Sequence, residues 1–147
     1  MVDDVILNKA AIIERCLQRV VEEYAGNDAN LVANQTKQDA IILNLQRACE
    51  ASIDLAMHVI SRRRLGIPQD SRDAFTILQA SGILPADLTV RMQHMVGFRN
   101  IAVHEYTRLN VDVVRSIITK QLDDFRLFSS TIVKAFASPT GGAESRP

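Results

Sequence analysis

The sequence predicts an all-α fold, an up-and-down bundle of four long helices plus one short helix. Gly and Pro together number only ten among the 147 residues, and 5% of the residues are aromatic, which disfavours a protein of many strands and tight turns. Hydrophobic residues make up 47% of the chain and recur at spacings of three and four along four long segments. No segment alternates polar and apolar residues as a strand would.

The first two long helices are defined by their apolar stripes and their glycines. Residues 5–24 form the first, and Gly26 is a typical helix stop. Residues 37–65 form the second, which Gly66 and Pro68 end. At about 42 Å it is long for a small bundle, so we expect part of it to pack on a second copy of the chain. The stripe of the first helix is Val5, Ile12, Ile13, Cys16, Leu17, Val20, Val21 and Tyr24.

The remaining helices are predicted from capping residues. Ser71 is suited to begin a short helix that ends at Gly82 and packs at one end of the bundle. Pro85 suits the first turn of the next long helix, which reaches about Val103. Asn110 can cap a single last helix that carries an apolar stripe as far as residue 136.

The chain therefore reads as one domain over residues 1–136, followed by a short tail. Residues 137–147 are small, polar and interrupted by Pro and Gly, so we expect them to be disordered. The acidic first residues do not resemble a signal peptide, and the longest apolar runs are too short to span a membrane. Cys16 and Cys49 lie on apolar stripes and are interpreted as core residues of a protein in the reducing cytoplasm, with no membrane contact.

Most familiar catalytic patterns are missing from the sequence. It has no glycine-rich phosphate loop and no zinc-protease motif. His58 and His94 have no Cys, Asp or Glu at metal-ligand spacing, so we interpret them as partly exposed or interface histidines. The sequence predicts neither a metal nor a cofactor.

Charge is balanced over the chain but unevenly distributed. Seventeen Lys and Arg offset seventeen Asp and Glu, yet residues 60–108 carry seven Arg and four acidic residues. The run Arg62, Arg63 and Arg64 either complements the negative end of its helix or contacts a phosphate or a partner. Arg91 could join such a contact. Arg47, three residues before Glu50, suggests an ion pair on the helix surface.

One octapeptide stands apart from the rest of the chain. It is Arg99-Asn100-Ile101-Ala102-Val103-His104-Glu105-Tyr106, of the form R-x4-H-x-Y with Asn directly after the Arg. It ends an apolar helix just before a loop, which is where functional residues tend to lie. On spacing alone it could equally be the end of an ordinary amphipathic helix.

The octapeptide is similar to the signature of the HEPN superfamily (higher eukaryotes and prokaryotes nucleotide-binding). More narrowly, the chain resembles the HepT toxins, which are partners of minimal nucleotidyltransferase (MNT) antitoxins. Residues 42–51, residues 65–68 with 71–75, and residues 95–100 agree with that family. The resemblance covers residues 3–136 and implies a HEPN-like homodimer of helical bundles.

The resemblance also implies an activity and a role for each residue of the motif. It implies a metal-independent endoribonuclease, the toxin of a type II/VII-like toxin–antitoxin system, acting on RNA without a cofactor. By resemblance, Arg99 and His104 are the catalytic pair and Asn100 supports the site. Tyr106 matches the tyrosine that the antitoxin AMPylates, which silences the toxin. Arg62, Arg63, Arg64 and Arg91 would then be candidate contacts to RNA or to a partner.

The chemistry of these residues favours a site shared by two copies. Cleaving RNA without a metal requires a base, an acid and a cation, and one imidazole cannot easily be base and acid at once. On a straight helix Arg99 and His104 differ by about 140° in azimuth and about 7.5 Å in rise. They converge only if the chain bends after Val103 or a second protomer contributes. Tyr106, seven residues after Arg99, should lie on nearly the same face, beside the phosphate.

A second hypothesis remains open from the sequence. The neutral net charge also suits a non-nucleolytic regulatory or nucleotide-binding helical subunit of a nucleotidyltransferase complex. Cleavage of RNA by the purified chain in EDTA distinguishes the two. A helical dimer of unrelated function is the third interpretation.

Overall fold

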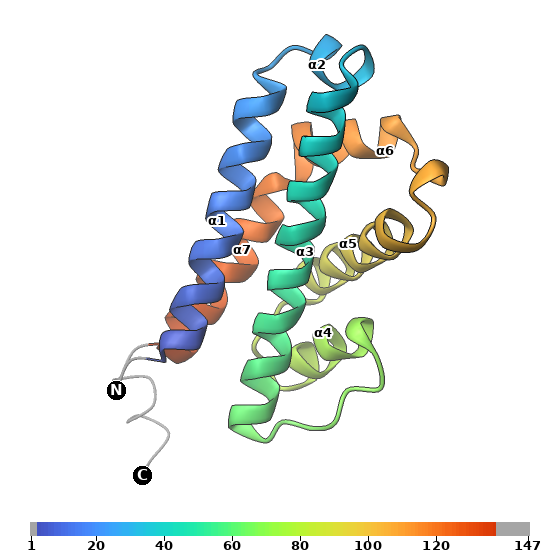
Figure 1. The fold of residues 1–147 in the computed structure, drawn as a ribbon. Coiled ribbons are helices and arrows are strands. Elements are labelled where there is room, and N and C mark those ends of the chain that lie inside the picture. Colours follow the sequence, from blue (N-terminus) through green and yellow to red (C-terminus); the bar gives the residue numbers. More distant parts are fainter. Residues whose placement is uncertain (1–2, 138–147) are drawn as a thin grey trace.

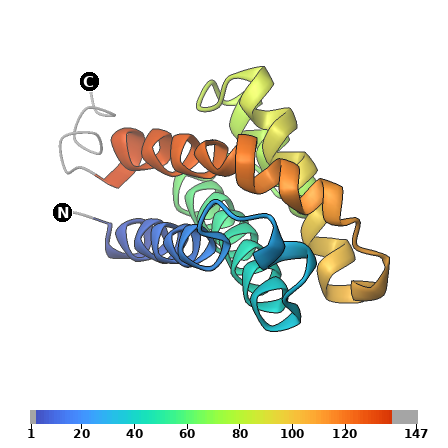
Figure 2. The same ribbon diagram turned by 90° about the horizontal axis from the view of Figure 1, so that it is seen from above.

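A computed structural model describes residues 3–137 of the chain, and within that range every regular element is helical. Of the predicted tail, residues 138–147 lie outside the described part, while Ala137 belongs to the last helical turn. In Figure 1 the helices α1, α3 and α7 run side by side, and α5 crosses them at a steep angle. Figure 2 shows the same arrangement from above. The predicted all-α bundle is confirmed.

Helix α1 spans Asp4–Tyr24 and is capped at both ends by the residues that flank it in the sequence. The side chain of Asp3 accepts hydrogen bonds from the backbone N–H groups of Val5 and Ile6, while Ala25 ends the helix in the left-handed conformation. Two members of the predicted stripe, Val5 and Val21, are exposed. They lie about 80° around the helix from the buried face. The residues that α1 buries are Ile6, Ile13, Cys16, Leu17 and Val20.

A one-turn helix, α2 (Ala29–Val32), leads into α3, which spans Gln35–Arg63. The side chain of Asn34 caps α3 by accepting from the backbone N–H of Lys37. Buried residues occur along α3 from Ile41 to Ile60, because α1, α4, α5 and α7 all pack on it. Helices of the same chain therefore pack along α3, and its length does not by itself require packing against a second copy of the chain.

Helices α4 (Ser71–Ala80) and α5 (Ala86–His104) follow, with α4 beside the C-terminal end of α3 (Figure 1). The residue that caps α4 is Asp70, whose carboxylate accepts from the backbone N–H of Asp73 at 2.8 Å. The prediction that Ser71 is the cap was wrong by one residue, and its hydroxyl is thereby left for another partner. Pro85 stands at the cap position of α5, directly before its first turn.

The predicted last helix is a run of helical turns with two π segments. Asn110 caps it as expected, accepting from the backbone N–H of Asp112 at 2.7 Å. Helix α6 (Val111–Ser116) passes into the π turn η2 (Ile117–Gln121), then into α7 (Leu122–Ile132) and a second π turn η3 (Val133–Ala137). At the junction Gln121 leaves helical geometry, with φ of −127°, as expected where a π bulge interrupts an α-helix.

Aromatic side chains fill the centre of the bundle. Phe75 of α4 and Phe128 of α7 meet edge to face, with ring centroids 5.4 Å apart. Cys16 and Cys49 are buried free thiols, as predicted, and burial raises the pKa of both. No helix between residues 3 and 137 has the length and apolar character needed to cross a bilayer.

Replacing Phe128 by Ala should destabilise the fold by about 3–5 kcal/mol, because the ring is fully buried and its removal leaves a cavity against Phe75. The free energy of unfolding in urea measures this loss. Leu127→Ala is the matched control, since its side chain is exposed on the same helix and should cost under about 1 kcal/mol. Equal losses for the two variants would contradict the described packing of α7.

Candidate functional site

Arg99 is held between three helices at the centre of the site. From α5, its Nη2 donates to the Ser71 hydroxyl of α4 at 3.2 Å, and its Nη1 lies 4.0 Å from the Glu50 carboxylate of α3. Only 23% of the side chain is exposed. The Nε atom is buried and has no acceptor among the described residues. The guanidinium is therefore fixed in place, and the part of the side chain that remains exposed suits an oxyanion ligand.

His104 and Asn100 lie together on a different face of α5. Both side chains are exposed, and the two residues are one helical turn apart. Helix α5 continues through His104, so the chain does not bend after Val103. Arg99 and His104 consequently remain about 140° apart around the helix. A single chain brings Asn100 to His104 but does not bring Arg99 and His104 to one phosphate.

The face of α5 that carries His104 also carries Gly97, seven residues earlier. The guanidinium of Arg72 lies over this glycine, and a Cβ there would be 2.8 Å from its Nη2. Arg72 is fixed on α5 by a hydrogen bond from its Nε to the Gln93 carbonyl oxygen at 3.4 Å. The absence of a side chain at Gly97 thus leaves room for the Arg72 guanidinium on the face of α5 that carries His104. The sequence had marked Arg72 only as one member of an arginine-rich region.

Tyr106 is directed to α3 by the end of helix α5. Glu105 leaves helical geometry, and Tyr106 begins a short 3₁₀ turn, η1 (Tyr106–Arg108). Its hydroxyl donates to a carboxylate oxygen of Asp39 on α3 at 2.5 Å. Burial, together with the hydrogen bond to Asp39 and the charge of that residue, raises the pKa of Tyr106 to about 12. The expectation that Tyr106 shares the face of Arg99 assumed a helix that continues to residue 106, whereas α5 ends at His104 and a 3₁₀ turn carries Tyr106 toward α3.

Helix α3 nevertheless links the two groups. Asp39, the partner of Tyr106, and Glu50, the partner of Arg99, are eleven residues apart on α3. Eleven residues are about three turns, so both carboxylates lie on one face of α3, about 16 Å apart along its axis. Sequence spacing could not predict that Asp39 bonds Tyr106 or that Ser71 bonds Arg99, because these partners are 67 and 28 residues apart in the sequence. Glu50 had been expected to pair with Arg47.

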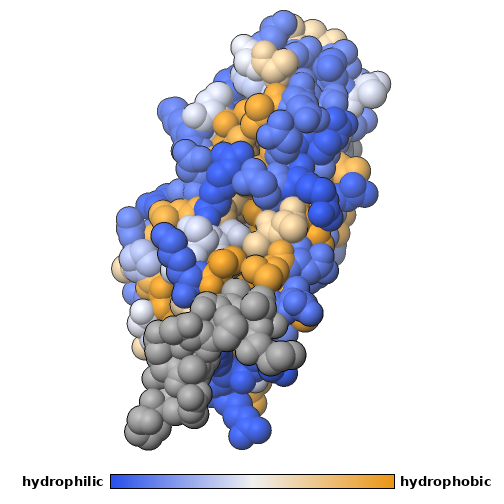
Figure 3. Space-filling view, turned by 90° about the vertical axis from the view of Figure 1, so that its left-hand side faces the viewer, coloured by the Kyte–Doolittle hydropathy of each residue, from blue (hydrophilic) through white to orange (hydrophobic). Residues whose placement is uncertain are grey.

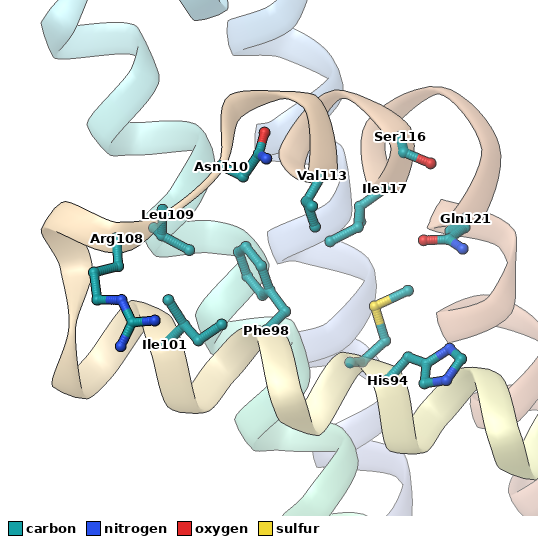
Figure 4. A pocket seen from close by; sticks show the side chains of 11 residues that line it. His94, Phe98, Ile101, Arg108, Leu109, Asn110, Val113, Ser116, Ile117 and Gln121 are labelled. Carbon is teal, nitrogen blue, oxygen red and sulfur yellow. The ribbon is translucent and has the colours of Figure 1, made fainter.

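The loop after the motif covers a cavity of about 320 Å³ between α5 and the α6–η2 segment. Figure 4 shows Ile101, Phe98, Leu109 and Val113 as its apolar walls, with His94 and Arg108 toward opposite ends. Arg108 also pairs with Glu105 across the 3₁₀ turn. The apolar packing of this loop on α5 fixes the position from which Tyr106 reaches Asp39.

The other arginines predicted as contacts lie away from Arg99. Arg62, Arg63 and Arg64 end α3 at least twelve residues beyond Glu50, about 18 Å along the helix. Arg63 stacks over Phe136, its guanidinium 4.8 Å from the ring centroid. Arg91 is already paired with Asp124 at 2.9 Å and Asp87 at 3.3 Å. The structure therefore places Arg62, Arg63 and Arg64 away from the motif and engages Arg91 in ion pairs.

Candidate metal ligands are not clustered in the described structure. His58 bonds to Asp3 at 2.9 Å, which ties the start of α1 to α3. Between residues 3 and 137, His, Cys, Asp and Glu side chains nowhere form a group of three that could hold an ion. The functional groups that the site offers are a guanidinium, an imidazole, an amide and a phenol.

Comparison with known proteins identifies the family. The sequence profile described as "Ribonuclease HepT-like" matches residues 11–132. The mRNA nuclease HepT of Shewanella oneidensis is 45% identical over 130 residues, which are 88% of this chain and 97% of that protein. The chain belongs to the ribonuclease HepT-like family. Membership confirms the resemblance inferred from the octapeptide and its flanks.

Solved structures of this family share the fold. A crystal structure of a toxin–antitoxin with AMP-PNP superposes with a TM-score of 0.86 at 43% identity, covering 90% of this chain and 99% of that one. The tri-AMPylated Shewanella oneidensis HEPN toxin, in complex with its MNT antitoxin, gives a TM-score of 0.85 at 44% identity, covering 90% and 98%. The HEPN-like bundle is thus the fold of the family.

Replacing Asp39 by Asn should lower the pKa of Tyr106 from about 12 toward 10, because the negative charge that disfavours the phenolate is removed. Absorbance of the phenolate during an alkaline titration measures the shift. Tyr24→Phe serves as the background, since the chain has two tyrosines, and circular dichroism confirms that the fold persists. An unchanged midpoint would show that Asp39 does not bond Tyr106.

Proposed function

We propose that this chain is a metal-independent endoribonuclease, the toxin of a toxin–antitoxin pair, which works as a homodimer in the cytoplasm. The observation that carries the proposal is the intact R-x4-H-x-Y motif, with Arg99 fixed and His104 exposed, in a member of the ribonuclease HepT-like family. RNA is the substrate, and an MNT antitoxin is the partner that controls the activity by AMPylation.

In the proposed reaction the 2′-hydroxyl of RNA attacks the adjacent phosphorus, and the 5′-oxygen leaves. His104 takes the 2′-hydroxyl proton as general base, and Asn100 supports it from one turn away. The guanidinium of Arg99 stabilises the negative charge that develops on the phosphate oxygens. The 5′-oxygen needs a proton from a second group as it departs. Neither water nor the same imidazole supplies that proton as readily as a second histidine.

The second copy supplies this acid in the proposed mechanism. Arg99 and His104 of one chain lie on different sides of α5, so a cleft that uses both is completed by two protomers. The histidine face of α5 carries exposed Ile101 and Val90 near Gly97, a surface suited to cover by a partner helix. The two His104 side chains would then serve as base and acid.

Control by AMPylation follows from the position of Tyr106. The Tyr106 oxygen attacks the α-phosphate of ATP bound by the antitoxin, pyrophosphate leaves, and the phenolic proton passes to Asp39, which already accepts it in a hydrogen bond. The bound adenylate adds bulk and negative charge close to the motif. It would repel the RNA phosphate that Arg99 must bind.

Replacing His104 by Ala should reduce RNA cleavage by at least about 10²-fold, since a general base contributes about 10²–10⁴-fold. Cleavage of RNA by the purified chain in EDTA is the measurement, with the molar mass of the same sample expected to be that of a dimer. His94→Ala is the matched control, an exposed histidine on the same helix, and should cleave normally. Absence of cleavage by the unaltered chain would instead favour the non-nucleolytic hypothesis.

Co-expression with an MNT antitoxin should add adenylate to Tyr106 and to no other tyrosine. Intact-mass spectrometry of the chain produced with and without the antitoxin measures the gain. Tyr106→Phe should abolish it, whereas Tyr24→Phe, the matched control, should retain it, because Tyr24 bonds Asp28 away from the motif. A gain that survives Tyr106→Phe would rule out the proposed regulation.

A further inference from the structure

A groove between α1 and α3 is lined by cations that the motif does not include. We call it the basic groove, and define it by Arg15 and Arg19 of α1 and by Asn44 and Arg47 of α3. Its volume is about 680 Å³, and its floor is formed by Ile12 and Cys16. Figure 3 views the molecule from the side of α1, where hydrophilic residues cover most of the surface.

Two of these arginines lack acidic partners. Within residues 3–137, neither Arg15 nor Arg47 has a carboxylate oxygen within 4.0 Å, whereas Arg19 is neutralised by Glu22 and Glu23 on its own helix. The acidic residues nearest in sequence are engaged elsewhere. Glu14 pairs with Arg126 at 3.3 Å, Glu50 faces Arg99, and Asp54 pairs with Lys9 at 3.2 Å. The groove therefore keeps an uncompensated positive charge.

Arg99 lies on α5, a helix that packs on α3 beside the basic groove. Arg47 precedes Glu50 by three residues, about 4.5 Å along α3, and Glu50 faces Arg99 on α5. Arg15, Arg47 and Arg99 thus stand on three helices that follow one another across the molecule (Figure 1). Packed helices are about 8–10 Å apart, so the three arginines stand on adjacent helices, with the Glu50 carboxylate between Arg47 and Arg99.

We propose that the basic groove binds the sugar–phosphate backbone of single-stranded RNA and directs it to Arg99. This inference rests on the proposed nuclease function and names the binding surface it uses. Each free guanidinium can hold two phosphate oxygens in a fork. The Asn44 amide nitrogen already donates to the Ala40 carbonyl, which leaves the amide oxygen to accept from a ribose 2′-hydroxyl.

The composition of the groove selects the backbone of RNA as its ligand. No aromatic side chain lines it, so bases are not bound there by stacking. Guanidinium donors next to an amide acceptor match the alternation of phosphate and hydroxyl along a ribose chain. An acidic protein surface would use the donors only and would leave the acceptor unpaired.

The test compares Arg15→Gln/Arg47→Gln with the unaltered groove, both in a His104→Ala background so that RNA stays intact. A polyuridylate oligonucleotide is the probe, and fluorescence anisotropy at several salt concentrations gives Kd and its salt dependence. The double variant should weaken binding at least about tenfold. The slope of log K against log salt should fall by about 0.7 for each lost phosphate contact. Both arginines are exposed, and circular dichroism checks the fold.

The matched control is Lys120→Gln/Lys134→Gln, which removes the same charge from exposed positions on η2 and η3. It should leave Kd nearly unchanged. A polythymidylate oligonucleotide, which lacks the 2′-hydroxyl, should bind more weakly than polyuridylate. In the Asn44→Leu variant this difference in Kd should disappear. In the chain that retains His104, the double variant should raise KM for RNA and leave kcat unchanged.

Three results would overturn the proposal: an unchanged Kd and salt slope in the arginine variant, an equal loss in the lysine control, or normal RNA binding combined with slower modification of Tyr106. The last would assign the groove to an acidic surface of the antitoxin. Binding is measured without cleavage, so these results decide the role of the groove even if the chain proves not to be a nuclease.

Discussion

The burial of α3 along its length is the constraint on which the rest of the structure depends. Helices α1, α2, α4, α5 and α7 pack on α3, so its remaining side is fixed in orientation. That side presents Asp39 to Tyr106, Glu50 to Arg99 and Arg47 to the basic groove. Polar groups from distant parts of the chain thus meet partners whose positions are set by hydrophobic packing elsewhere on the same helix.

The unbroken course of α5, in contrast, separates Arg99 and His104, the two proposed catalytic residues. Because the helix continues through His104, Arg99 projects toward α3 and α4 while His104 projects outward with Asn100. The helical geometry that fixes the guanidinium also separates it from the imidazole. A proposed reaction that needs a base, an acid and a cation together is then most simply completed by a second protomer.

Charge distribution explains how a chain of zero net charge can be suited to RNA. Many surface cations are neutralised by carboxylates on their own or neighbouring helices, as Arg91 is by Asp87 and Asp124. Arg15 and Arg47 are not, since the acids closest to them in sequence pair with other cations. Such pairings set the local electrostatic potential at the surface. For the binding of a polyanion, this local potential matters more than the net charge of the chain.

The sequence by itself determined the fold class, the order of the long helices, the Asn110 cap and the octapeptide. Those features depend on local periodicity and on residues close in the chain, such as Asn110 and Asp112. Only the tertiary structure decided that Ser71 bonds Arg99 after Asp70 takes the cap, that Tyr106 turns to Asp39, and that Arg47 has no acidic partner. These outcomes depend on which helices become neighbours, and on where α5 ends, because contacts between residues far apart in sequence leave no mark in local spacing.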